Sequence, residues 1–126
     1  MSERVPRELQ YLIRYMESNY MQPLTLEFLS SFSGFSVPHL IRLFDRHFGK
    51  SPIDYCIDLR LSHAKLLLKD SDLSVSQIGK MVGIPGSSYF GALFKKRTGM
   101  SPGQYRKKIR QPVMNLKDVK DVDRDD

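Results

Sequence analysis

The sequence predicts an all-α protein built from one helical unit that occurs twice. Apolar residues recur at steps of three and four along most of the chain, which is the period of an amphipathic helix. No segment of convincing length alternates apolar and polar residues in the manner of a strand. A motif also recurs at a constant offset of 50, a spacing typical of a repeated supersecondary unit. Phe44, Gly49, Ser51, Pro52 and Tyr55 return as Phe94, Gly99, Ser101, Pro102 and Tyr105.

Three helices are predicted before residue 50. The second begins after Thr25, a good N-cap residue, and ends at Gly34, because a left-handed C-cap suits glycine. The third begins after Ser36 and has Pro38 in its first turn, where proline is tolerated. The first helix ends before Pro23, and its apolar positions are one turn apart. These positions are Leu9, Leu12, Ile13, Met16 and Tyr20.

The second half of the chain repeats this order of helices. Ser51 followed by Pro52 predicts the start of a long helix that runs to about Lys69. Three shorter helices are predicted over 74–82, 86–98 and 101–109. A short helix, a glycine turn and a second helix indicate a helix-turn-helix in each half. Ser30 and Gly79 hold equivalent places in the two first helices, where small side chains let helices cross closely.

These seven predicted helices divide the chain into four segments. Residues 1–50 form a first helix-turn-helix subdomain, 51–70 a long linker helix, and 71–110 a second helix-turn-helix subdomain. Residues 111–126 are polar and are predicted to be disordered. A linker of about 19 residues spans roughly 28 Å, because each helical residue rises 1.5 Å. With the half-width of each unit added, two recognition helices would lie near one turn of DNA apart, about 34 Å.

Positive charge is concentrated in the second half. Residues 1–72 hold nine basic and nine acidic side chains, whereas residues 73–116 hold eight basic side chains and no acid. The last ten residues reverse the balance, with five aspartates against three basic residues. Eight cations without counter-charges favour a polyanion as partner over an ordinary solvated basic face.

Composition argues against several other classes of protein. No apolar stretch approaches eighteen residues and no signal peptide begins the chain, so neither membrane insertion nor export is expected. The single cysteine, Cys56, has no partner for an internal disulfide, which fits a cytoplasmic protein, and it suits a small apolar role in a core. His39, His47 and His63 lack the spacing of a zinc finger, and no catalytic or phosphate-loop motif occurs. We therefore expect no metal, no cofactor and no enzymatic activity.

Five ordered motifs resemble the DNA-binding domain of the AraC/XylS transcriptional regulators over about residues 7–110. The resemblance implies two helix-turn-helix units that insert recognition helices, about 36–48 and 86–98, into successive major grooves of double-stranded DNA. It also implies a regulator, most often an activator, that contacts RNA polymerase. The motifs run from Leu40-x-x-Leu43-Phe44 to Tyr55, Arg60-Leu61-x-x-Ala64-x-x-Leu67-Leu68, Ile78-Gly79-x-x-Val82-Gly83-Ile84, Ser88-Tyr89-Phe90-x-x-x-Phe94-Lys95-Lys96, and Gly99-x-Ser101-Pro102-x-x-Tyr105-Arg106.

The resemblance, together with helical periodicity, gives two sets of candidate DNA contacts. Arg42 is the long donor best suited to a guanine, while the second helix offers mainly small residues. The base-contact candidates are Pro38, Ile41, Arg42, Asp45, Ser88, Gly91 and Ala92. The phosphate-contact candidates are His39, Arg46, Lys50, Ser51, Ser87, Tyr89, Lys95, Lys96, Ser101 and Arg106.

Two interpretations remain open at this point. The sparse polar chemistry of the two recognition faces favours a protein-interaction module with weak, mostly non-specific DNA binding. The basic second unit favours sequence-specific DNA binding, and we give it more weight. The first predicted helix begins within seven residues of Met1, which fits either a stand-alone regulator or the C-terminal part of a longer one. The segment itself is expected to be monomeric.

Overall fold

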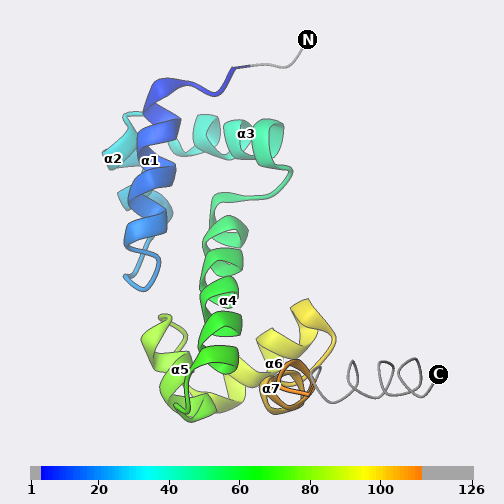
Figure 1. Ribbon diagram of the computed structural model, residues 1–126. Helices are drawn as coiled ribbons and strands as arrows, with labels where there is room; N and C mark the ends of the chain where they lie inside the picture. Colours follow the sequence, from blue (N-terminus) through cyan, green and yellow to red (C-terminus); the bar gives the residue numbers. More distant parts are fainter. Residues whose placement is uncertain (1–3, 112–126) are drawn as a thin grey trace, which may run out of the picture. The chain divides into compact units, whose positions relative to one another are not determined.

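The computed structural model describes residues 4–111, and this range folds into helices without a strand (Figure 1). The predicted all-α class is confirmed. The predicted disorder of the C-terminal segment falls almost wholly outside the described residues. The helices are α1 (Arg7–Ser18), α2 (Leu26–Ser33), α3 (Val37–Phe48), α4 (Pro52–Asp70), α5 (Val75–Met81), α6 (Ser87–Thr98) and α7 (Pro102–Ile109).

The chain divides into two compact units, and the boundary between Ser62 and His63 falls inside α4. The first half of α4 therefore belongs with α1, α2 and α3, which we call unit 1. Its second half belongs with α5, α6 and α7, which we call unit 2. The segment predicted as a linker, 51–70, thus contributes one half to each unit. No described helix is both long enough and apolar enough to cross a membrane.

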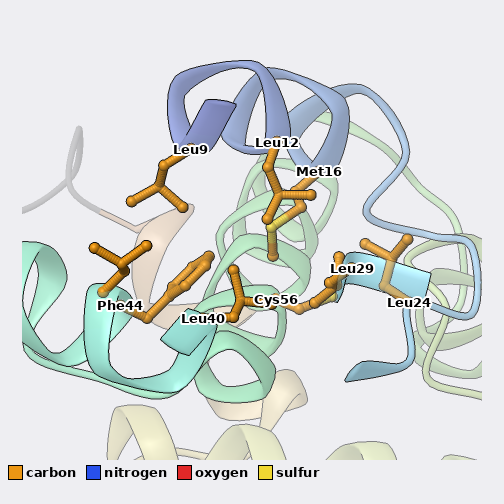
Figure 2. Close-up of a cluster of buried hydrophobic side chains, with 9 residues drawn as sticks. Leu9, Leu12, Met16, Leu24, Leu29, Leu40, Phe44 and Cys56 are labelled. Carbon is orange, nitrogen blue, oxygen red and sulfur yellow. The ribbon is translucent and has the colours of Figure 1, made fainter. Parts of the chain in front are cut away.

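Unit 1 has a core made by all four of its helical segments (Figure 2). Leu9, Leu12 and Met16 come from one face of α1, because their spacing of three and four follows the helical turn. Phe44 is fully buried, and its ring meets that of Tyr55 edge-on, with centroids 5.5 Å apart. The other buried members are Leu24, Leu29, Leu40, Leu43 and Cys56.

Cys56 is a core residue, which agrees with the small apolar role predicted for it. It is 3% exposed and lies 3.9 Å from the carbonyl oxygen of Tyr20, measured from its sulfur. Desolvation by burial raises the pKa of the Cys56 thiol, although the nearby Arg60 acts in the opposite direction. The thiol is therefore protonated at neutral pH, and a reactive role is disfavoured.

The predicted helix starts and stops of unit 1 are largely confirmed. Thr25 accepts from the Phe28 amide at 3.0 Å, and Ser36 accepts from the His39 amide at 3.3 Å. Gly34 ends α2 in the left-handed region, with φ at 82°. One extrapolation was wrong: α1 ends at Ser18, so Tyr20 lies beyond the helix and not on its apolar face.

Unit 2 repeats the arrangement with tighter packing at one point. Ile78, Val82, Phe90 and Phe94 are fully buried. A Cβ atom placed on Gly79 would lie 2.9 Å from the Ile84 carbonyl oxygen and 3.0 Å from Cγ of Phe90. Both distances are too short for a relaxed side chain, so glycine is required where α5 meets the following turn and α6.

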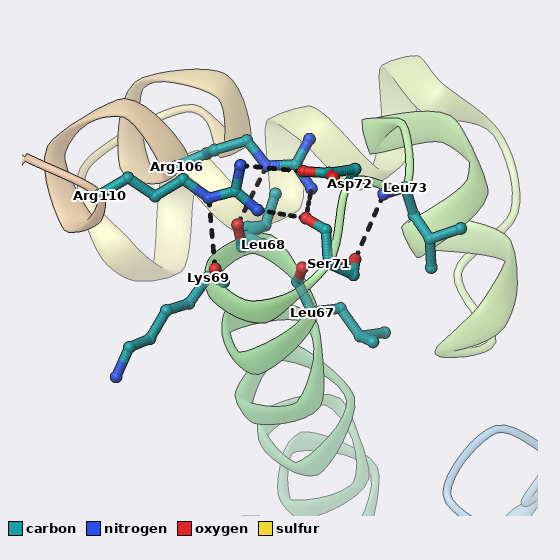
Figure 3. Close-up of polar contacts among 8 residues, drawn as sticks. All are labelled: Leu67, Leu68, Lys69, Ser71, Asp72, Leu73, Arg106 and Arg110. Carbon is teal, nitrogen blue, oxygen red and sulfur yellow. Dashed lines mark hydrogen bonds and ion pairs between the residues drawn. The ribbon is translucent and has the colours of Figure 1, made fainter.

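The end of α4 in unit 2 is held by Arg106 of α7 and by Arg110, the C-cap residue of that helix (Figure 3). Arg106 donates from Nε to the Leu68 carbonyl oxygen at 3.0 Å and from Nη2 to that of Ser71 at 3.1 Å. Arg110 donates to the carbonyl oxygens of Lys69 and Ser71, and it pairs with the Asp72 carboxylate at 3.3 Å. These guanidinium groups satisfy carbonyls that a helix C-terminus leaves without partners.

Candidate nucleic-acid interface

The outward face of α3 carries the chemistry predicted from its periodicity. Leu40, Leu43 and Phe44 are buried, and the opposite side of the helix is exposed. Among residues 4–111, no hydrogen bond or ion pair is made by the side chain of Arg42 or of Asp45, so both groups are available to a ligand. Ile41 is 40% exposed and adds an apolar surface beside them. The exposed residues of this face are Pro38, Ile41, Arg42 and Asp45.

Residues at the edges of α3 differ in how available they are. His39 is exposed, and its ring meets that of Phe35 edge-on with centroids 5.0 Å apart, which orients it. Arg46 is exposed, next to Asp45 in the chain. Lys50 instead forms an ion pair with Asp58, with its Nζ 2.5 Å from the carboxylate. That pair competes with the predicted phosphate contact of Lys50.

The corresponding face of α6 is smaller and less polar. Ser88 and Ala92 are exposed, Gly91 is partly exposed, and Phe90 and Phe94 are buried on the opposite side. No atom would lie within 4 Å of a Cβ placed on Gly91, apart from the helix's own backbone. The space on this face is therefore open, and what α6 can offer to a base edge is one hydroxyl and a surface of methyl and methylene groups.

The first turn of α6 differs from that of α3 in its cap. Its N-cap residue, Gly86, has no side chain and a φ of 95°, so no hydroxyl satisfies the first amides. Ser87, Ser88 and Tyr89 are exposed around this turn. Amides at a helix N-terminus point outward and favour an anion, since the helix dipole adds positive potential there. This feature was foreshadowed in the sequence only by the glycine at the cap position.

The last turn of α6 presents three adjacent cations. Lys95, Lys96 and Arg97 are all exposed. Arg97 is exposed although it lies three residues after the buried Phe94. The side chain is long enough to leave the apolar face and keep its charge in water. On α7, Lys107 and Lys108 are also exposed, and they are cations that the sequence-derived candidate set omitted.

Three other phosphate candidates, Arg106 and Ser101 in unit 2 and Ser51 in unit 1, have structural roles. Arg106 uses its Nε and Nη2 donors on the end of α4, which favours a structural role over the predicted phosphate contact. Ser101 accepts from the Gln104 amide at 3.2 Å, while the Gln104 side chain accepts from the Ser101 amide at 3.1 Å. Ser51 likewise accepts from the Asp54 amide at 3.1 Å. Both serines act as helix caps, so their hydroxyl groups are already used within the protein. A phosphate at these helix starts would therefore be bound by backbone amides more than by the serine hydroxyls.

The remaining side chains give no indication of a metal site. Within residues 4–111, no group of three His, Cys, Asp or Glu residues is close enough together to hold a metal ion. Within each unit, the polar candidates lie along the outward face and the ends of one helix, which suits a charged ligand.

Comparison with known proteins gives this arrangement a context. A family model described as a helix-turn-helix domain matches residues 29–108. The MmsAB operon regulatory protein of Pseudomonas aeruginosa is 36% identical over 104 residues, which are 82% of this chain and 34% of that protein. The transcriptional activator RhaR of Yersinia pseudotuberculosis is 40% identical over 79 residues, which are 62% of this chain and 27% of that protein. The matched part of this chain thus spans between about a quarter and a third of the length of these curated relatives.

A solved structure agrees with the sequence relatives. A transcriptional regulator of Chromobacterium violaceum, described as having an AraC-type DNA-binding domain, superimposes with a TM-score of 0.77. It is 30% identical in sequence, and the match covers 83% of this chain and 94% of that one. The matched range of the family model begins within α2 and ends within α7, so it includes both proposed recognition helices, α3 and α6.

Proposed function

The chain belongs to the AraC/XylS family of DNA-binding transcriptional regulators, and on this premise we propose that it binds specific double-stranded DNA with both units. In each unit the second helix of the helix-turn-helix enters a major groove: α3 in unit 1 and α6 in unit 2. Such a protein acts on DNA in the cytoplasm and uses no cofactor. It is a binding protein, and its family is not one of enzymes.

The observation that carries this proposal is the availability of Arg42. It is exposed on the outward face of α3 and has no partner among the described residues, so its five donors are available. A guanidinium fork matches the O6 and N7 acceptors of guanine in the major groove. Ile41 and Pro38 suit the methyl group of thymine, and Asp45 can accept from the amino group of cytosine.

Unit 2 contributes mainly contacts that do not depend on sequence. Lys95 and Lys96 are exposed at one end of α6, and the amides of its first turn, near Ser87 and Tyr89, are available at the other. Lysine acts as a point charge toward a phosphate and carries little base preference. Ser88, Gly91 and Ala92 allow close approach, but they provide few hydrogen bonds to bases. We therefore propose that unit 1 reads sequence and unit 2 holds the backbone.

The presence of two helix-turn-helix units in one chain supports binding to two successive grooves, because α3 and α6 each offer one recognition helix. Successive major grooves on one face of DNA are about 34 Å apart. A single copy of the chain, as a monomer, would then suffice for a non-palindromic site.

A second function, contact with RNA polymerase during activation, is favoured by an aromatic cluster of unit 1. Tyr15, Phe28 and Phe32 lie with ring centroids 4.7–6.0 Å apart, and Phe32 is 43% exposed. These rings belong to α1 and α2, outside the two proposed recognition helices. RhaR is described as an activator. We propose that this cluster is the protein-contacting surface, which an in vitro transcription assay of a Phe32→Ser variant with normal DNA affinity would test.

The experiment for groove insertion is selection of bound sequences from a random DNA library, with the wild type and with Ala92→Arg. The substitution adds a five-donor fork to the outward face of α6, one turn from Ser88. We expect the wild type to select a motif around the Arg42 contact. The variant should add a new base preference about one helical turn, ~34 Å, from it. An unchanged motif, with helix content intact by circular dichroism, would mean that α6 does not insert.

A further inference from the structure

We propose that Asp58 competes with DNA phosphates for Lys50 and so weakens the binding of unit 1 to the DNA backbone. Lys50 lies between α3 and α4, and Asp58 lies in the second turn of α4. This inference rests on the proposed DNA binding, because it concerns how tightly the same site holds its ligand. It assigns a role in affinity to a carboxylate outside both proposed recognition helices.

The ion pair between Lys50 and Asp58 is close but open to solvent. The Nζ atom of Lys50 lies 2.5 Å from Oδ2 of Asp58, and the two side chains are 38% and 39% exposed. A ligand can therefore reach the ammonium group, but one of its three donors is already used. The carboxylate also cancels part of the positive charge that a phosphate would meet.

The start of α4 carries a second carboxylate. Asp54 lies in the first turn, four residues before Asp58, so the two side chains share one face of the helix. The first amides of a helix attract an anion, and Asp54 already supplies negative charge there. A phosphate that approaches this end of α4 therefore meets two acidic groups. Lys50 is placed to offset them, and Asp58 occupies it.

Unit 2 lacks both carboxylates at the equivalent positions. At the offset of 50, Gln104 replaces Asp54 and Lys108 replaces Asp58. Lys108 is exposed, and its side chain makes no ion pair within residues 4–111. The same place in the repeat thus carries an anion in unit 1 and a cation in unit 2. This reversal of charge supports weaker backbone binding by unit 1.

The pair is weak enough for DNA to displace. Ion pairs between partly exposed side chains contribute little to stability, and salt screens them. A phosphate is an alternative partner of the same sign, and the DNA backbone presents several of them close together. Lys50 can therefore exchange Asp58 for a phosphate when DNA binds. Because phosphates carry no sequence information, the loss of affinity is the same for every DNA sequence.

The test is a double-mutant cycle of Asp58→Asn and Lys50→Gln, with DNA affinity measured by fluorescence anisotropy at about 0.1 M salt. Charges more than about 10 Å apart are largely screened under that condition. Asp58→Asn should bind preferred and scrambled DNA about 2- to 5-fold more tightly than the wild type does. In the Lys50→Gln background this gain should largely disappear.

Glu8→Gln is the matched control, because it also removes one exposed negative charge from unit 1, at the start of α1. It should bind DNA as the wild type does, and circular dichroism should give all variants the same helix content. An equal gain from Asp58→Asn in both backgrounds would overturn the proposal, since the carboxylate would then act without Lys50. So would an Asp58→Asn variant that binds no more tightly than Glu8→Gln.

The wild type in the same titrations separates this inference from the proposed function. A wild type that binds DNA, together with an Asp58→Asn variant that shows no gain, would refute this inference alone. A wild type that binds no DNA would refute the proposed function and this inference with it.

Discussion

Ser30 in unit 1 and Gly79 in unit 2 hold the same place in the repeat, but they contact the turn after their helix in different ways. The Ser30 hydroxyl donates to the Phe35 carbonyl oxygen at 2.6 Å. At the equivalent point of unit 2, the Ile84 carbonyl oxygen is so close to Gly79 that even a methyl group would lie 2.9 Å from it. Unit 1 therefore ties the turn to the first helix through a hydrogen bond. Unit 2 does so by close packing of the backbone, with the Ile84 amide donating to the Gly79 carbonyl oxygen at 2.7 Å.

Arg60 and Arg110 show the opposite case, in which the two units agree. They are 50 positions apart. Arg60 donates to the carbonyl oxygens of Tyr20 and Gln22, both at 2.6 Å, just after α1. Arg110 makes the same kind of contact with Lys69 and Ser71 at the end of α4. The framework of the repeat is thus shared, and the units differ most on the exposed faces of α3 and α6.

The largest expected effect comes from the net positive charge of unit 2, which unit 1 lacks. If about six phosphates are neutralised, log affinity should fall against log salt with a slope near −5, which is about 1,000-fold between 50 and 200 mM. Because we assign the phosphate contacts mainly to unit 2, Lys95→Gln/Lys96→Gln should make the slope shallower by about 2. The measurement is anisotropy across a salt series. A wild-type slope shallower than about −2 would favour the protein-interaction interpretation.

The contrast between Ser30 and Gly79 gives the next effect. Gly79→Val should destabilise unit 2 by about 3 kcal/mol, because its side chain would press on a backbone carbonyl that cannot move aside. Gly91→Ala is the matched control in the same unit: its Cβ meets nothing within 4 Å, and it should stabilise α6 by up to about 1 kcal/mol. The chain has no tryptophan, so amide hydrogen exchange is the suitable probe for each unit. Equal protection in the two variants would show that the packing of Gly79 is not limiting.

A smaller effect is expected at the end of α4. Arg106→Gln should lower the stability of unit 2 by about 2 kcal/mol, because the carbonyls of Leu68 and Ser71 lose a charged donor. Lys107→Gln, one residue along, should change it by less than about 0.5 kcal/mol. Urea unfolding followed by hydrogen exchange compares the two. If Arg106→Gln instead left stability unchanged and weakened DNA binding, the original phosphate assignment would be correct.

Much of the fold could be predicted because local signals and the repeat agree. Ser36 and Gly34 mark their helix boundaries through cap chemistry, which depends on neighbouring residues only. The outward faces of α3 and α6 follow from the apolar residues opposite them. The structural role of Arg106 could not be predicted in this way, because the carbonyl that it contacts, that of Leu68, is 38 residues away in the sequence. Every residue type carries a backbone carbonyl, so the sequence does not show which one will accept. The ion pair of Lys50 with Asp58 is similar, since either residue alone resembles an ordinary surface charge.

The division of labour between the units is tested most directly by competition binding of two variants on preferred and scrambled DNA. Arg42→Ala should remove discrimination at one or two base pairs and weaken binding to the preferred site by about 1–3 kcal/mol, with little change on scrambled DNA. Lys95→Ala should weaken binding to both DNAs about equally, because a phosphate contact is independent of sequence. If Arg42→Ala lowered affinity equally for both DNAs, Arg42 would be a phosphate contact, and unit 1 would not read sequence through it.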